Sequence, residues 1–174
     1  MKKIILGVCG SIAAYKAGDI IRRLREKDCA VCVVMTKEAQ RFISPLTLGS
    51  LAEGEVYTDM FEGDAWKMAH IDIAREADAV LIAPATANII AKIAHGFADD
   101  LLSTLVLTTR VPVVIAPAMN DEMYANAMVV ENCAKLKKHG VKLVEPVRGK
   151  LACGGVGVGH LADIEDIVKA VLKA

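Results

Sequence analysis

The sequence predicts an α/β domain in which helices cover both faces of a mostly parallel β-sheet. Short apolar runs alternate with segments of helical periodicity, and this alternation is typical of such sheets. Hydrophobic residues make up 54% of the 174 residues and the mean hydropathy is +0.40, whereas aromatic residues make up only 4%. The apolar excess is therefore aliphatic, as expected of strands that are buried on both faces.

The length of the chain fits one domain that is large enough to bury a sizeable core. The sequence contains no internal repeat, low-complexity tract or linker, so the expected domain covers residues 1–174. Residues 149–159 are the exception, because they include five glycines and lack periodicity. We expect a flexible loop there, of the kind that often forms a lid or flap over a binding site.

Charge and composition exclude several classes of protein. The chain has 21 basic and 21 acidic residues, so no excess of cations is present for binding nucleic acid. No apolar stretch reaches the ~20 residues of a membrane span, since the longest candidate, residues 79–91, is interrupted by Pro84. With five cysteines, an odd number, we expect neither a disulfide framework nor a metal site, and we expect a reducing cytoplasm.

The first 35 residues predict a strand, a helix and a second strand. The apolar run 3–8 ends in Gly7-Val-Cys-Gly10-Ser11, and apolar residues then recur at helical spacing over residues 12–27. The Val-rich run 30–35 predicts the second strand. Such a unit joins two parallel strands through a right-handed crossover.

Three further apolar runs predict three more strands, at residues 79–83, 111–116 and 141–144. The first two end in Ala83-Pro84 and Ala116-Pro117. Helical spacing predicts helices over residues 87–94, 99–108 and 125–139. A pattern similar to a capping box, Asp163-Ile-Glu-Asp166, predicts a last helix that ends at Leu172.

Ligands bind beyond the carboxyl ends of the strands in such sheets, and Gly10-Ser11 lies there. Backbone N–H groups at a helix start and a serine hydroxyl can hold a phosphate. The second strand ends at Thr36 rather than at an acid that would bind a ribose diol, so a mononucleotide fits better than a dinucleotide. A tight turn with an ordinary helix cap explains Gly10-Ser11 equally well.

Polar side chains follow the next two strands. Thr86 and Asn88 offer hydrogen bonds in the segment Pro84-Ala-Thr-Ala-Asn88, although a simple helix cap also accounts for them. Asn120 carries a donor and an acceptor and can orient a carboxylate without adding charge, or it can cap a helix. Ser103 and Thr104 face a ligand or are ordinary helix residues.

Two further residues carry reactive groups. His70 lies in Met68-Ala-His-Ile-Asp72, and a lone histidine of this kind is more often structural or exposed than catalytic. Cys153 lies in the Gly-rich segment, where a thiol is unusual for a core residue and can donate a proton or act as a nucleophile if its surroundings tune it.

Together these motifs resemble the homo-oligomeric flavin-containing cysteine decarboxylases, nearest to the branch that acts in coenzyme A synthesis. The matching segments run through nearly the whole chain in family order: Gly10 to Lys16, His70 to Asp72, Pro84 to Asn88, Gly96 to Thr104, Pro117 to Asn120 with Met123, and Leu151 to Gly154. Two residues depart from the pattern, Tyr124 where many members have Trp and His160 where some have Arg.

The resemblance implies a Rossmann-like or flavodoxin-like fold, bound FMN and a role for each motif residue. His70 resembles the active-site base, near the flavin of a neighbouring subunit; Asn120 resembles the residue that binds the substrate carboxylate; Cys153 resembles the proton donor on the flap. Met123, Ala152 and Gly154 resemble further substrate contacts. The residues that resemble FMN contacts are Gly10, Ser11, Ile12, Thr36, Ala85, Thr86, Asn88, Ser103, Thr104 and Ala118.

The implied reaction is the FMN-dependent decarboxylation of 4′-phosphopantothenoylcysteine to 4′-phosphopantetheine by a carboxy-lyase. The implied assembly is a homotrimer or an assembly of trimers, with a phosphopantothenate–cysteine ligase as a separate chain or a following domain. Alternatives are a decarboxylase of a peptide C-terminal cysteine, a flavin prenyltransferase and a non-catalytic regulatory subunit. A prenyltransferase leaves the His70, Asn120 and Cys153 set unexplained, and regulatory subunits usually carry acidic tails.

Overall fold

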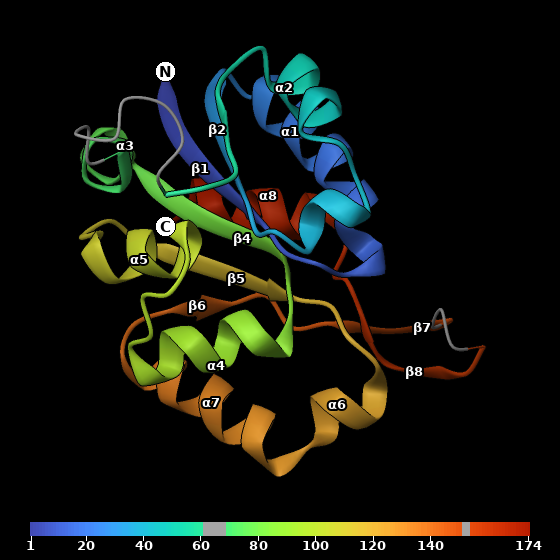
Figure 1. Ribbon diagram of the computed structural model, residues 1–174. Helices are drawn as coiled ribbons and strands as arrows, with labels where there is room; N and C mark the ends of the chain where they lie inside the picture. The colour runs from blue at the N-terminus through green and yellow to red at the C-terminus, as the bar shows by residue number, and fades with distance from the viewer. Residues whose placement is uncertain (61–68, 151–153) are drawn as a thin grey trace.

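A six-stranded parallel sheet with the order β3-β2-β1-β4-β5-β6 forms the centre of the molecule (Figure 1). The computed structural model describes residues 1–60, 69–150 and 154–174. The strands of this sheet are β1 (Lys2–Val8), β2 (Cys29–Met35), β3 (Val56–Tyr57), β4 (Ala79–Ala85), β5 (Val113–Pro117) and β6 (Lys142–Leu143).

Helices cover both faces of the sheet, as the composition predicts. One face carries α1 (Ala17–Arg25), α2 (Pro45–Ala52) and α8 (Ile164–Leu172), and the other carries α3 (Ala69–Glu76), α4 (Ala87–His95), α5 (Leu101–Thr108) and α7 (Ala127–Lys138). Shorter helices are the 3₁₀ turns η1 (Ile12–Lys16) and η2 (Ala39–Arg41), and α6 (Asp121–Ala125). The described helices include none that is long and apolar enough to cross a membrane.

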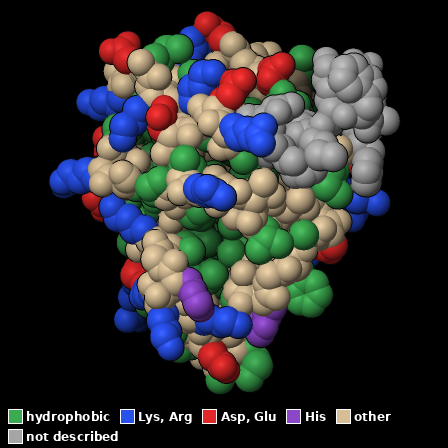
Figure 2. Space-filling view, turned by 90° about the vertical axis from the view of Figure 1, so that its left-hand side faces the viewer, with side chains coloured by type: hydrophobic (Ala, Val, Ile, Leu, Met, Phe, Trp, Pro, Cys, Tyr) green, Lys and Arg blue, Asp and Glu red, His purple; other side chains and the backbone are tan. Residues whose placement is uncertain are grey.

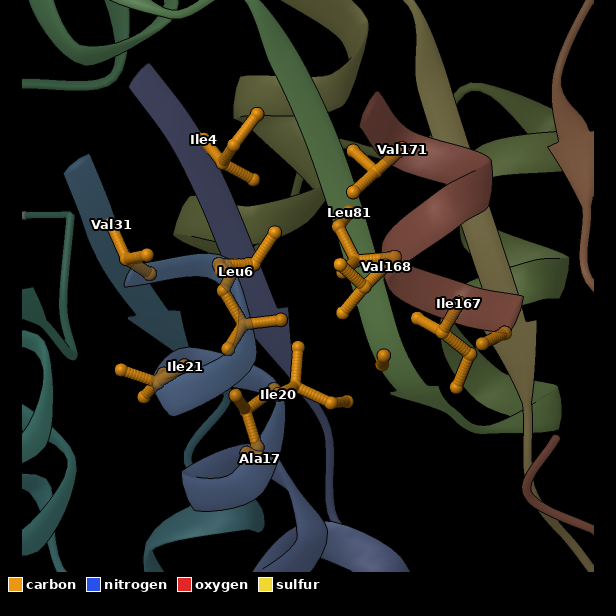
Figure 3. Close-up of a cluster of buried hydrophobic side chains, with 14 of the residues drawn as sticks. Ile4, Leu6, Ala17, Ile20, Ile21, Val31, Leu81, Ile167, Val168 and Val171 are labelled. Carbon is orange, nitrogen blue, oxygen red and sulfur yellow. The ribbon is translucent and has the colours of Figure 1, made fainter. Parts of the chain in front are cut away.

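Strand residues alternate between the two layers of the core. Ile4 and Leu6 of β1 join the cluster beneath α1 and α8, whereas Ile5 joins the cluster on the opposite face. Figure 3 shows the first cluster, in which Ile20 of α1 and Val168 of α8 approach these strand residues. Because all these side chains are at most 2% exposed, both faces of the sheet contribute to the core.

The order of the strands creates a switch point between β1 and β4. After β1 the chain moves outward to β2 and β3 and then returns to place β4 on the other side of β1. The loops after β1 and β4 therefore diverge toward opposite faces, which opens a crevice at the carboxyl edge of the sheet. The expected α/β architecture with a parallel sheet is confirmed.

Several elements differ from the prediction. All five predicted strands are present with ends shifted by one or two residues, but the sequence analysis missed β3, α2 and α3. The predicted helix over residues 125–139 is present as α7, with its ends shifted by one or two residues, but the short helix α6 before it was not predicted, and the two meet at Asn126. The Asn126 side chain accepts a hydrogen bond from the N–H of Met128 (3.0 Å) and so begins a new helix.

The expectation of an irregular loop over residues 149–159 is also wrong for its described part. Strands β7 (Val147–Lys150) and β8 (Val156–His160) form an antiparallel hairpin, in which Gly149 pairs with Gly157 and Lys150 with Val156. Glycines at these positions remove the side chains whose alternation would have indicated strands. Residues 151–153, between the two strands, lie outside the described residues.

Candidate active site

A cavity of about 690 Å³ opens at the carboxyl edge of the sheet, beside the switch point. The turn after β1, the start of α4, the connection from β5 to α6 and the β7–β8 hairpin line it. The sequence-predicted site residues that it brings together are Gly10, Ser11, Ile12, Thr86, Ala118, Asn120, Met123 and Gly154.

The turn after β1 is held by Ser11. Its hydroxyl accepts a hydrogen bond from the N–H of Ala13 (3.3 Å) and donates one to the carbonyl of Ala118 (3.3 Å), which ties this turn to the end of β5. The predicted helix cap is therefore present. The N–H groups of Gly10 and Ile12 make no hydrogen bond to the described residues, so this turn retains donors for an anion.

The turn requires glycine at position 10. A Cβ there would lie 2.5 Å from the Cβ of Glu38 and 3.1 Å from its carbonyl carbon. This close approach brings the segment after β2 against the turn after β1. The glycine therefore sets the shape of the cavity floor.

Asn120 performs the helix-cap role that the sequence left open. Its Oδ1 accepts hydrogen bonds from the N–H groups of Glu122 (3.0 Å) and Met123 (3.3 Å) at the start of α6. These contacts fix the orientation of the amide, because an oxygen that accepts two N–H bonds cannot exchange places with the Nδ2 group. Nδ2 is therefore identified as the donor end of the amide.

The start of α4 contributes a second set of donors. Thr86 follows β4, and its hydroxyl accepts a hydrogen bond from the N–H of Ile89 (3.4 Å) as the helix cap. Thr86 and Ala87 both line the cavity, so the positive end of the α4 dipole lies at its wall. This end of the helix favours a bound anion.

The β7–β8 hairpin is anchored beside Asn120. The N–H of Met119 donates a hydrogen bond to the carbonyl of Gly159 (3.0 Å), and a Cβ at Gly159 would collide with the carbonyl oxygen of Met119. A Cβ at Gly157 would collide with the carboxylate of Asp121. The glycines let β8 lie directly against the connection from β5 to α6.

Gly159→Ala is expected to lower kcat/KM by about tenfold and the free energy of unfolding by about 1–3 kcal/mol, because the added methyl group must displace backbone. Steady-state kinetics and chemical denaturation measure the two effects. Gly155→Ala is the matched control, since a Cβ there meets nothing within 4 Å. Equal behaviour of the two variants would contradict the anchoring role of Gly159.

Five predicted cofactor contacts do not line this cavity. Ala85 is buried within β4, and Asn88 is exposed at the second position of α4. The hydroxyl of Thr36 accepts a hydrogen bond from the N–H of Ala39 (3.3 Å). Ser103 forms a capping box with Asp100, whose backbone N–H lies 3.2 Å from the serine hydroxyl. Thr36 and Ser103 thus form local hydrogen bonds, and the cofactor roles of all four residues stay predictions.

Thr104 is the fifth, and its hydroxyl is a buried polar group without a partner in the described part of the chain. A buried hydroxyl of this kind usually has a hydrogen-bond partner, such as protein, water or ligand. Asp100, four residues before Thr104, already has hydrogen-bond partners. Burial alone would raise the pKa of Asp100, but hydrogen bonds from Lys92 (2.6 Å) and from Ser103 outweigh burial and lower this pKa.

The three remaining predicted residues cannot be placed at the cavity. The backbone of His70 lies in the first turn of α3, and its side chain lies outside the described residues. Ala152 and Cys153 lie wholly outside them, although they follow Lys150 of β7, which lines the cavity. Their roles stay predictions.

The sequence analysis did not assign several residues that line the cavity. Lys16, Lys150 and His160 bring charge or a titratable group, and the others are Ala13, Tyr15, Ala87, Met119, Gly159 and Leu161. Nδ1 of His160 lies 3.0 Å from the carbonyl of Leu161, so Nδ1 carries the proton, since a carbonyl can only accept. The sequence could have indicated Lys16 as a cavity residue, because Lys16 ends the segment Gly10 to Lys16, which matches the family pattern.

The four described cysteines, Cys9, Cys29, Cys32 and Cys133, are free thiols. Burial raises the pKa of Cys9 and of Cys32 to about 12, and it also raises the pKa of Cys29 and Cys133. Cys29 and Cys32 have the C-x-x-C spacing that can indicate a metal or redox pair, but three residues along a strand place side chains on opposite faces. Within the described ranges no cluster of potential metal ligands occurs.

The fold and the cavity define a class of protein: a flavodoxin-like α/β domain with a cavity at the switch point of its sheet, where such domains bind their ligands. The model of the family described as Flavoprotein matches residues 1–174. The chain belongs to this family.

Comparisons with individual proteins agree with this assignment. A probable phosphopantothenoylcysteine decarboxylase of Streptococcus mutans is 47% identical over 173 residues, which cover 98% of this chain and 97% of that protein. The coenzyme A biosynthesis bifunctional protein CoaBC of Vibrio vulnificus is 46% identical over 168 residues, 96% of this chain but 42% of that protein. The chain thus spans less than half of the bifunctional relative.

Among solved structures, a cysteine-to-serine mutant of PPC decarboxylase complexed with pantothenoylaminoethenethiol superimposes with a TM-score of 0.90. It is 32% identical in sequence, and the match covers 97% of this chain and 95% of that one. The flavodoxin-like fold expected from the resemblance is confirmed.

Proposed function

We propose that this chain is an FMN-dependent decarboxylase of 4′-phosphopantothenoylcysteine, which forms 4′-phosphopantetheine in coenzyme A biosynthesis. The observation that carries the proposal is the convergence of three groups on one cavity: the open N–H groups after β1, the start of α4 and the oriented amide of Asn120. The near full-length similarity to a protein named for this reaction supports the same conclusion.

The residues present fit FMN. The cavity has the size of a cofactor site, and its lining combines backbone donors at Gly10 and Ile12 with apolar side chains such as Ile12 and Met119. Backbone donors and the α4 dipole suit a phosphate, and the apolar lining suits a ring system.

Bound FMN would supply the redox chemistry that the side chains lack. Oxidation of the substrate thiol would provide a sink for the electron pair that CO₂ leaves behind, and the electrons would be returned to the substrate afterwards. The chain itself would position the substrate. The Nδ2 group of Asn120 would bind the carboxylate, and Met123, which is 48% exposed beside it, would pack against the cysteine portion. His70 would act as acid–base and Cys153 would donate the final proton.

The purified protein incubated with FMN is expected to be yellow and to convert 4′-phosphopantothenoylcysteine into CO₂ and 4′-phosphopantetheine. Absorbance spectroscopy and mass spectrometry of the product measure the two effects. A product lighter by two hydrogens would instead identify an oxidative decarboxylase that releases the enethiol. A protein that takes up no FMN and releases no CO₂ would contradict the proposal.

We also infer that the enzyme is a homotrimer or an assembly of trimers. A second hollow of about 610 Å³ lies at the ends of α4 and α5, where Phe97 and Leu107 are 60% and 61% exposed. Figure 2 views the side of the molecule on which these helix ends lie. Hydrophobic side chains gather in the middle of that side. Apolar area of this kind favours a covered surface.

The expected compartment is the cytoplasm, which is supported by the free thiols of all four described cysteines. A phosphopantothenate–cysteine ligase, on a separate chain or a continuing one, would supply the substrate. The bifunctional relative, which extends well beyond the length of this chain, supports such a partner.

A further inference from the structure

The charged lining of the active-site cavity is entirely basic in the part of the chain that the structure describes. Lys16 and Lys150 line it, and its described lining contains no aspartate or glutamate. A cavity with ammonium groups and no carboxylate favours an anionic ligand. Such a cavity is notable in a chain whose formal net charge is zero.

The two lysines also differ from the basic residues that have a structural partner. Lys92 forms ion pairs with Asp99 (2.8 Å) and Asp100 (2.6 Å), and Lys3 pairs with Glu76 (2.8 Å). The side chain of neither Lys16 nor Lys150 forms an ion pair or hydrogen bond with a described residue. Their charges are therefore available to a ligand.

Lys16 lies where the cavity continues into a second depression. A groove of about 720 Å³ between α1 and α8 shares Lys16, His160 and Leu161 with the cavity. Within that groove Arg23 is already paired, with Glu26 (2.9 Å) and Glu165 (3.1 Å). Lys16 at the junction thus offers an unneutralised cation to a ligand that extends out of the cavity.

The two lysines come from different elements of the fold. Lys16 ends η1 and is half-buried, so its position is restricted by the turn that Ser11 caps. Lys150 ends β7 on the hairpin and is exposed. A group held by both would therefore bridge the body of the domain and the hairpin that precedes residues 151–153.

We propose that Lys16 and Lys150 bind the 4′-phosphate of the substrate and thereby select phosphorylated over dephosphorylated substrates. The proposal rests on the proposed function, in which Asn120 binds the carboxylate at the other end of the same molecule. The open N–H groups of Gly10 and Ile12 are a separate set of donors that suits the cofactor phosphate. A dianionic phosphate matches two ammonium groups in charge.

The test compares kcat/KM for 4′-phosphopantothenoylcysteine and for pantothenoylcysteine. The preference of the wild type for the phosphorylated substrate is expected to fall by about tenfold in Lys16→Met and in Lys150→Met, because each removes one charge-assisted contact. Lys16→Arg is expected to restore most of the preference. Lys138→Met on α7 is the matched control, since Lys138 lines neither depression and its substitution should leave the preference unchanged.

Calorimetric binding of 4′-phosphopantetheine and of pantetheine provides a readout that does not depend on turnover. The ratio of their dissociation constants should fall by a similar factor in both variants, and the wild-type ratio should fall with added salt. Titration with FMN separates the two phosphates: weaker FMN binding by Lys16→Met with an unchanged substrate preference would overturn the proposal in favour of a cofactor contact.

The remaining outcomes are distinct. If the wild type decarboxylates both substrates and neither lysine variant changes the preference, the phosphate site is wrong and the proposed function stands. If the loaded wild type decarboxylates neither substrate, the proposed function is wrong and the phosphate site fails with it. Loss of preference in the Lys138→Met control would also overturn the assignment.

Discussion

Asn120→Asp is expected to lower kcat/KM for the cysteine-ended substrate by about 10³-fold, because it places a carboxylate opposite the substrate carboxylate. The fold should survive, since an aspartate oxygen can accept the same two N–H bonds, from Glu122 and Met123, and aspartate is as good a helix cap as asparagine. The variant should also retain FMN. Steady-state kinetics, FMN absorbance and thermal denaturation measure the three properties.

The chain provides a matched control for this substitution. Asn126 caps α7 in the same way, through a hydrogen bond from the N–H of Met128 (3.0 Å), and does not line the cavity. Asn126→Asp should therefore keep both stability and activity. A fully active Asn120→Asp enzyme would remove Asn120 from carboxylate binding, and an equal loss in both variants would assign the effect to the caps.

His70→Asn is expected to lower the rate of product formation by about 10²–10⁴-fold, which is the range for loss of an acid–base group. Asparagine keeps a polar amide of similar size but cannot transfer a proton at neutral pH. Because the predicted role of His70 is chemical, the variant should bind FMN and substrate as the wild type does. Single-turnover measurement of CO₂ release, with FMN content as a second readout, checks this.

His95→Asn is the corresponding control. His95 ends α4, where its Nε2 lies 3.0 Å from Oδ1 of Asn132 on the molecular surface, and it lines neither depression around the carboxyl edge. The same chemical change should therefore leave turnover intact. Normal turnover by His70→Asn would exclude the imidazole from the mechanism.

The parts of the fold that follow from hydrophobic burial could be predicted from the sequence. Each of the main strands is an uninterrupted apolar run because both of its faces are covered, and the loops after β1, β4 and β5 were correctly expected at one edge. Cap residues such as Asn120 and Asp163 were recognised from their position before a helix.

The parts that depend on contacts between distant segments could not be predicted. The β7–β8 hairpin is held by the contact of Gly159 with Met119, forty residues earlier in the chain. The sequence left Ser103 open between a ligand contact and an ordinary helix residue, and only the fold shows that its hydroxyl bonds to the Asp100 backbone within one helical turn. In contrast, α2 had a local signal that was overlooked, since Ser44 caps it and Pro45 opens it.

The protonation of the interior cysteines has a practical consequence for labelling. Thiolates, rather than thiols, react with electrophiles, and at neutral pH a thiol with a pKa of about 12, such as that of Cys9 or Cys32, yields almost none. Burial also raises the pKa of Cys29 and of Cys133. Iodoacetamide or a maleimide dye applied to the native enzyme is therefore expected to leave Cys9 and Cys32 unlabelled, which mass spectrometry of the labelled peptides measures.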